Sequence, residues 1–174
     1  MAGVAEVLAD SFHSREGVFG WAHPLLRLGI YEDVSNRLRS ASPHHICLVA
    51  VDVTATSCNN LAGTVEMAVR AITPGKSDRS NEFYRHSYQH PYLSNLAVHP
   101  NYRRRGVAGQ LLASCEKIAL CWGFHNLYLH VLENNHQARQ LYFKMGYQLD
   151  RLDTSWNTWV LRKPRQLLLH KRLD

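Results

Sequence analysis

The sequence predicts a protein built around a mixed α/β sheet. Stretches of strand length alternate with helical patterns along the chain, and turn residues separate them. Hydrophobic residues make up 45% of the 174 residues, which is enough for a sizeable core. A chain of this length is expected to form one domain, residues 1–174.

Two helical patterns open the chain. Apolar residues from Val4 to Phe12 have helical spacing, so a helix is expected almost from residue 1. Pro24 can occupy the first turn of a second helix, whose apolar stripe runs from Leu25 to Leu38.

Three strands are expected next. The segment ICLVAVDV (46–53) is typical of a buried strand, and LAGTVEMAVR (61–70) alternates as its hairpin partner would. The polar segment 73–91 is predicted to be a long loop that could line an acceptor site. A third strand, YLSNLAV (92–98), follows it.

The second half of the chain alternates between helix and strand. A short helix within NNHQARQLYFKMGY is predicted to be capped by asparagine at its start and closed by Gly146. The other predicted elements are a helix at about 106–122, a strand at 126–132, and two final strands at 147–152 and 165–173.

Composition limits the possible functions. The formal charge of +6 favours an acidic partner, such as nucleic acid or a phosphorylated small molecule. The four cysteines lack paired spacing, so reduced thiols in an intracellular protein are expected. The histidines lack a third spaced ligand, so no metal is expected. We find neither an apolar run of membrane-spanning length nor a secretory signal.

The segment after the third strand favours phosphate binding. Three arginines lead into small residues at the start of a helix, where backbone N–H groups lack intrahelical partners and the helix dipole attracts anions. The alternative is an ordinary helix start with solvated arginines. The spacing is neither that of a P-loop nor G-x-G-x-x-G. The residues concerned are Arg103, Arg104, Arg105, Gly106, Val107, Ala108 and Gly109.

Two motifs resemble signatures of the GNAT acetyltransferase superfamily. Arg103-x-x-Gly106-x-Ala108 is similar to its R/Q-x-x-G-x-G/A motif. The second motif, N-x-x-A-x-x-L-Y-x-x-x-G-F/Y, is matched by Asn135, Ala138, Leu141, Tyr142, Gly146 and Tyr147. The resemblance covers about residues 45–150. It implies the GNAT acyl-CoA N-acyltransferase fold, in which a mixed, mostly antiparallel sheet is flanked by helices. It also implies an enzyme that transfers acetyl from acetyl-CoA to an amine without an acyl-enzyme.

The resemblance also implies a cofactor site. Backbone groups of Leu96, Ala97 and Val98 would hold the pantetheine arm of acetyl-CoA, and the turn 103–109 would cradle its pyrophosphate. Asn135 would contact the cofactor from another loop. Tyr142 would protonate or stabilise the departing thiolate, unless it is only a core aromatic residue.

The general base is suggested by a narrower resemblance. The segments YLSNLAVHPNYRRRGVA and LYLHVLENNHQA resemble protein N-terminal acetyltransferases of the NatE kind, in which a tyrosine and a histidine act through a water. The matching residues are Tyr92 and His130. A strand histidine that only satisfies a hydrogen bond is the alternative for His130. Glu66 is a rival base, although the alternating strand favours a solvated carboxylate there.

The expected acceptor is a protein N-terminal α-amine, with lysine a further possibility. Arylalkylamines such as serotonin, or other small amines, are an alternative. Two further classes remain open: a nucleic-acid-binding module, suggested by the basic segment LRKPRQLLLHKR, and a silent acetyl-CoA sensor. The pattern also resembles plastid and cyanobacterial GNAT enzymes, which implies the chloroplast stroma or a cyanobacterial-type cytoplasm. The family's usual first strand is not evident, so it is either missing or trimmed.

Overall fold

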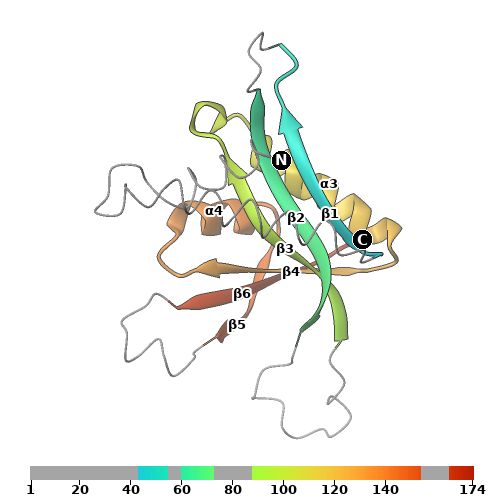
Figure 1. Ribbon diagram of the computed structural model, residues 1–174. Coiled ribbons are helices and arrows are strands. Elements are labelled where there is room, and N and C mark those ends of the chain that lie inside the picture. The colour runs from blue at the N-terminus through green and yellow to red at the C-terminus, as the bar shows by residue number, and fades with distance from the viewer. Residues whose placement is uncertain (1–42, 55–59, 73–87, 154–164) are drawn as a thin grey trace, which may run out of the picture. The chain divides into compact units, whose positions relative to one another are not determined.

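The computed structural model describes residues 43–54, 60–72, 88–153 and 165–174 (Figure 1). The two helices predicted for the first forty residues lie outside these ranges, and so do residues 73–87 of the predicted loop.

Six strands of the described residues form one mixed, mostly antiparallel sheet in the order β1-β2-β3-β4-β6-β5. The strands β3 and β4 are parallel, whereas β4–β6 and β6–β5 are antiparallel. This arrangement confirms the predicted fold class. The elements are β1 (His45–Val51), β2 (Leu61–Ile72), β3 (Tyr88–Val98), the 3-10 turn η4 (Pro100–Tyr102), α3 (Val107–Cys121), β4 (Asn126–Leu132), α4 (His136–Lys144), β5 (Gln148–Asp153) and β6 (Gln166–Arg172).

One predicted boundary is wrong. Residues 88–91 were expected to be loop, yet β3 begins at Tyr88 and continues through Pro91. Proline lacks the N–H that a strand ladder uses, so it usually indicates that a strand has ended. Here Pro91 is buried within the strand. The next residue, Tyr92, has a high strand propensity.

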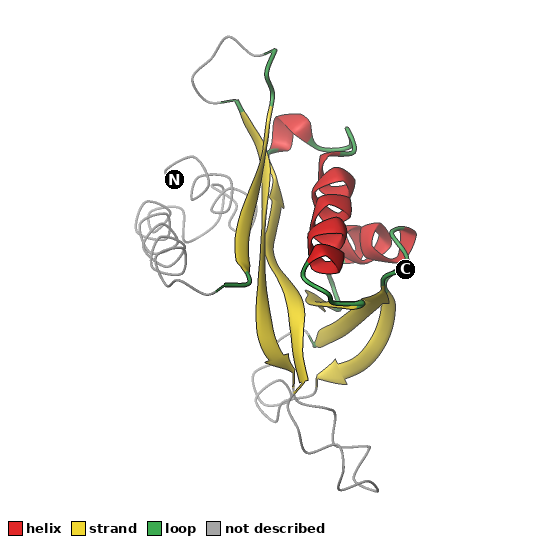
Figure 2. Ribbon diagram, turned by 90° about the vertical axis from the view of Figure 1, so that its right-hand side faces the viewer, coloured by secondary structure: helices red, strands yellow, loops and turns green. Residues whose placement is uncertain are grey.

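The described chain divides into two compact units. Of the described residues, the first comprises 43–54, 60–67 and 94–115. In it, β1, the first part of β2 and the last part of β3 lie side by side (Figure 1). The first half of α3 covers one face of these strands (Figure 2). Both faces of β2 are buried here, because the consecutive residues Val65, Glu66 and Met67 are at most 3% exposed.

Of the described residues, the second unit comprises 68–72, 88–93, 116–153 and 165–174. Its central strand β4 alternates as a half-buried strand should: Leu127, Leu129 and Val131 are buried, and the residues between them are half-exposed. The cap predicted for α4 is confirmed, because the side chain of Asn135 accepts a hydrogen bond from the N–H of Ala138 at 3.1 Å.

Three cysteines lie within the described ranges, and each of them is a free thiol: Cys47, Cys115 and Cys121. Within the same ranges, none of the helices has both the length and the apolar character needed to span a bilayer.

Candidate active site

The first unit contains the arginine-rich turn. Arg104 has φ 63° and Gly106 has φ 83°, so the chain passes twice through the left-handed region before α3 begins. The Arg103 side chain donates from Nε to the carbonyl of Val98 at 3.2 Å, which ties the turn to the end of β3. Helical hydrogen bonding starts directly after the turn, because the N–H of Gln110 in α3 donates to the carbonyl of Gly106.

The turn can attract an anion. Its three arginines are exposed, and the guanidinium of Arg105 lies 5.6 Å from the centre of the Tyr102 ring. The first N–H groups of α3 have no intrahelical acceptor, and the positive end of the helix dipole lies at the same place. Guanidinium groups form charge-assisted hydrogen bonds to phosphate. The geometry therefore suits a phosphate group.

The strand that precedes the turn approaches β2 closely. A Cβ added to Gly63 would lie 2.9 Å from the carbonyl oxygen of Ala97 and 3.1 Å from a methyl of Val107. The side chain of Ala97 is buried, and those of Leu96 and Val98 are half-buried. Glycine is thus required at position 63 for this packing. The sequence pattern around Gly63 does not reveal this requirement, because Ala97 lies on another strand.

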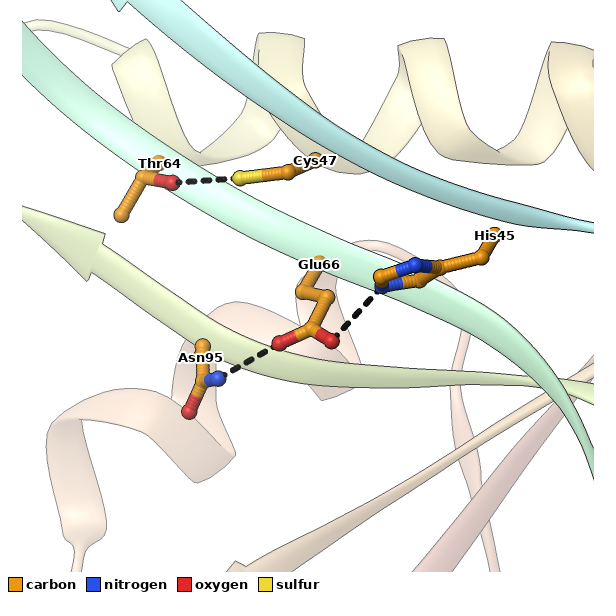
Figure 3. A network of polar contacts seen from close by, with 5 residues as sticks. All are labelled: His45, Cys47, Thr64, Glu66 and Asn95. Carbon is orange, nitrogen blue, oxygen red and sulfur yellow. Dashed lines mark hydrogen bonds and ion pairs between the residues drawn. The ribbon is translucent and has the colours of Figure 1, made fainter. Parts of the chain in front are cut away.

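A polar cluster lies beside this strand (Figure 3). Glu66 was expected to be solvated, but this is wrong, because the residue is only 3% exposed. Its Oε1 lies 2.8 Å from Nε2 of His45, and its Oε2 accepts a hydrogen bond from Nδ2 of Asn95 at 2.7 Å. A strand period indicates which residues share a face, but not whether another element covers that face.

The second unit brings two of the predicted catalytic residues together. The hydroxyl of Tyr92 on β3 lies 2.8 Å from Nδ1 of His130 on β4. The guanidinium of Arg70, on the adjacent strand β2, lies 4.9 Å from the centre of the Tyr92 ring. Such a contact orients the ring and places a positive charge beside the phenol. Sequence reasoning missed Arg70, because its contact depends on the pairing of two strands.

Tyr142 lies in the same unit. It is 8% exposed on α4, and its ring meets that of Tyr147 edge-on at 5.8 Å. Burial, and secondarily the nearby Tyr92, raises the pKa of Tyr142 to about 12. The phenol therefore remains protonated at neutral and moderately alkaline pH and can serve as a hydrogen-bond donor.

A row of aromatic rings extends from Tyr92 across the sheet. Tyr92 is in register with Tyr128, which in turn is in register with His170. The rings of His90 and Tyr128 are 4.9 Å apart, and those of Tyr128 and His170 are 5.6 Å apart. Burial lowers the pKa of His90, whereas burial and then Asp150 raise the pKa of Tyr128. Both shifts favour the uncharged form of the side chain near neutral pH.

The chain belongs to the acetyltransferase (GNAT) family, whose sequence pattern matches residues 8–147. Chloroplastic relatives are known from Arabidopsis thaliana. GCN5-related N-acetyltransferase 10 is 28% identical over 174 residues, which cover 98% of this chain and 67% of the relative. GCN5-related N-acetyltransferase 7 is 35% identical over 78 residues, which cover 45% of this chain and 28% of the relative. The chain thus spans only part of the length of these proteins.

Solved structures share the fold. The NatC complex bound to Gag peptide and CoA is 17% identical, with a TM-score of 0.65 over 99% of this chain and 90% of that one. Arabidopsis thaliana NAA60 in complex with acetyl-CoA is 22% identical, with a TM-score of 0.62 over 81% of this chain and 82% of that one. At these identities the likeness shows a common fold, which confirms the expected GNAT fold.

Proposed function

We propose that residues 1–174 form one N-acetyltransferase domain, which transfers the acetyl group of acetyl-CoA directly to the α-amine of a protein N-terminus. The observation that carries the proposal is the 2.8 Å hydrogen bond between Tyr92 and His130. Together these side chains supply a proton acceptor of moderate strength, and Tyr142 in the same unit supplies a neutral donor.

Acetyl-CoA is the proposed cosubstrate. Family membership supports this choice, and so do the CoA and acetyl-CoA bound in the structures that share the fold. We assign the pyrophosphate to the turn 103–109 and the pantetheine arm to the backbone of residues 96–98. Asn135 is assigned a cofactor contact in addition to its observed role as the cap of α4. No metal is assigned.

The Tyr92–His130 hydrogen bond allows two proton routes. If Nδ1 of His130 carries the proton and donates to the Tyr92 oxygen, Nε2 keeps a lone pair and can act as the base directly. If Tyr92 donates to Nδ1 instead, the phenol can take a proton from a water while it passes its own to the imidazole. Replacing Tyr92 by phenylalanine removes only an orienting partner in the first route, whereas it removes the relay itself in the second.

Tyr142 is assigned to the leaving group. Attack of the amine on the thioester carbonyl breaks the carbon–sulfur bond, and the electron pair remains on the sulfur of CoA. A phenol that stays protonated can donate a hydrogen bond to this thiolate, which lowers the barrier of the step. The pKa of about 12 favours hydrogen-bond donation over complete proton transfer, because a thiol has an ordinary pKa near 8.5.

The nature of the base favours an α-amine as acceptor. An α-amine has a pKa near 8 and a lysine amine one near 10.4, so at pH 8 about half of the former but under about 1% of the latter is neutral. That difference corresponds to about 3 kcal/mol, which a lysine-specific base would have to supply. The peptide in the NatC structure is in keeping with a peptide acceptor.

The chloroplastic relatives support a plastid location. The stroma is the compartment that we propose.

An acceptor screen tests the proposed function. The protein is incubated with acetyl-CoA and, in separate reactions, with peptides that have a free N-terminus, with N-terminally blocked lysine peptides and with arylalkylamines. We expect the highest kcat/KM on the free α-amines. Faster transfer to lysine or to an arylalkylamine would replace the proposed acceptor. Tight binding of acetyl-CoA without transfer to any of them would identify a sensor.

A further inference from the structure

The buried carboxylate of Glu66 is an unusual feature of the first unit. A charged group at 3% exposure is costly unless donors compensate it. Two donors come from the neighbouring strands: Nε2 of His45 on β1 at 2.8 Å and Nδ2 of Asn95 on β3 at 2.7 Å (Figure 3). The cluster therefore links three adjacent strands of the sheet through one side chain.

The backbone of Asn95 is unusual as well. Its φ of 54° lies in the left-handed region, although the residue stands within β3. Side chains other than glycine disfavour this region, and asparagine tolerates it better than most. Such a conformation persists when its surroundings hold it in place, and it often marks a functional position. The hydrogen bond from Asn95 to Glu66 is a contact of this kind.

We infer that Glu66 is a positioning residue for cofactor binding. Its hydrogen bond holds Asn95 in the left-handed conformation and thereby sets the direction of the backbone at residues 96–98, which follow immediately. This inference rests on the proposed function, which assigns those residues to the pantetheine arm of acetyl-CoA. His45 holds the other carboxylate oxygen with a hydrogen bond of 2.8 Å. Loss of the clamp, meaning the Glu66–Asn95 hydrogen bond, should therefore weaken the binding of coenzyme A.

The same geometry argues against Glu66 as the general base. A base has to exchange its proton with the acceptor amine or a water, but each oxygen of Glu66 is already hydrogen-bonded to a neighbouring side chain. The carboxylate is also almost fully buried. A glutamine at this position separates the two roles, because it has the same shape but cannot act as a base.

Four variants test the clamp. In Glu66→Gln the amide oxygen can still accept from Asn95, and its nitrogen can donate to His45 once that ring adopts its other tautomer. We expect its Kd for coenzyme A to remain within about twofold of wild type, with most of kcat retained. Glu66→Leu removes both hydrogen bonds, so its Kd should rise about tenfold. Asn95→Ala should do the same, whereas Asn95→Gly should bind normally, because glycine adopts positive φ freely.

A double variant sharpens the test. In Glu66→Leu with Asn95→Gly, the backbone no longer needs an anchor, so the affinity lost in Glu66→Leu alone should be partly restored. Thr64→Val is the matched control. Thr64 is 1% exposed on the same strand, and its hydroxyl donates to the carbonyl of Leu48. Its replacement should lower the unfolding temperature without changing the Kd.

The measurements are calorimetric titration with coenzyme A, steady-state kinetics and, in the free protein, amide hydrogen exchange at Leu96 and Ala97. Exchange should accelerate in Glu66→Leu but not in Glu66→Gln. If Glu66→Leu or Asn95→Ala binds coenzyme A like wild type, the inference is wrong. A loss of kcat of a hundredfold or more in Glu66→Gln at unchanged Kd would identify a base instead.

Failure of the proposed cofactor site gives a different result, because wild type itself would then not bind coenzyme A. In that case the exchange rates of the free protein alone decide whether Glu66 holds this backbone. Failure of the proposed acceptor alone would leave coenzyme A binding in place, and the comparison of variants would stand. Should Glu66→Leu fail to fold, Asn95→Ala and Asn95→Gly carry the same comparison, and equal affinities of these two variants would overturn the inference.

Discussion

Gly63 and Ala97 approach each other so closely that a single added methyl group has no room: a Cβ on Gly63 would lie 2.9 Å from the carbonyl oxygen of Ala97. That oxygen belongs to the backbone, so it cannot rotate away as a side chain can. The packing of β2 against β3 therefore determines the backbone position of residues 96–98, to which we assign the pantetheine arm.

Gly63→Ala should consequently lower both stability and cofactor affinity. Overpacking in a core typically costs about 1–3 kcal/mol. Thermal unfolding and the Kd for coenzyme A measure the two effects. The double variant with Val107→Ala relieves only the contact with the Val107 methyl, so it should not restore the affinity. Restoration by that second change would show that α3, and not the Ala97 carbonyl, is displaced.

The turn is tested at Gly106, which has φ +83° and no atoms within 4 Å of an added Cβ. Gly106→Asp should weaken coenzyme A binding about tenfold or more, because a carboxylate would face the pyrophosphate. Gly123 is a matched control, since it has φ +84° and equally open surroundings just after α3. Gly123→Asp should introduce similar backbone strain but leave the affinity unchanged. Equal losses in both variants would remove the pyrophosphate from the turn.

The base is tested by the pH dependence of kcat/KM. His130→Ala should slow transfer to a peptide α-amine more at pH 7 than at pH 9, because at pH 9 most of the amine is already neutral. With a lysine acceptor the variant should stay impaired over the whole range. A constant loss at every pH would mean that His130 positions the substrate, and no loss would exclude it as the base.

Tyr92→Phe distinguishes the two proton routes. If the imidazole acts directly, the variant should keep more activity than His130→Ala, because only the partner of Nδ1 is lost. If the phenol relays the proton, the two variants should be about equally slow, and the double variant should be no slower than either one. Additive losses would show that the two side chains act independently of each other.

Tyr142→Phe should lower kcat about tenfold or more while Kd for coenzyme A changes little, since the hydroxyl is needed when the thiolate departs. Rapid mixing under single-turnover conditions tests whether the loss falls on acetyl transfer itself. Full turnover in the folded variant would leave Tyr142 as a packing residue.

The raised pKa of Tyr142 also predicts an effect on stability. The pKa is about 12 in the folded protein and near 10 in the unfolded chain, so the folded state holds the proton more tightly. The free energy of unfolding is therefore unaffected below pH 10 and falls as the pH rises toward 12. By pH 11.5 wild type should lose about 2 kcal/mol more than Tyr142→Phe, relative to pH 9. Urea unfolding of both proteins measures the difference.

Local patterns determined most of the secondary structure. The segment 126–132 was predicted as a strand with the bounds that β4 has, and Asn135 and Gly146 delimited α4, because capping and strand propensity depend on residues close together in the chain. The two family motifs likewise pointed to the acetyltransferase (GNAT) family, whose sequence pattern matches residues 8–147. The narrower resemblance to N-terminal acetyltransferases indicated Tyr92 and His130, which the fold brings within hydrogen-bonding distance.

Only the tertiary structure decided the rest. The sequence pattern showed that Glu66 alternates with apolar neighbours, but its burial depends on what covers the second face of β2. The left-handed turn at Asn95 and the contact between Arg70 and Tyr92 depend on partners more than twenty residues away in the chain. Short-range periodicity contains no information about such partners, because strand pairing brings together residues that no local rule connects.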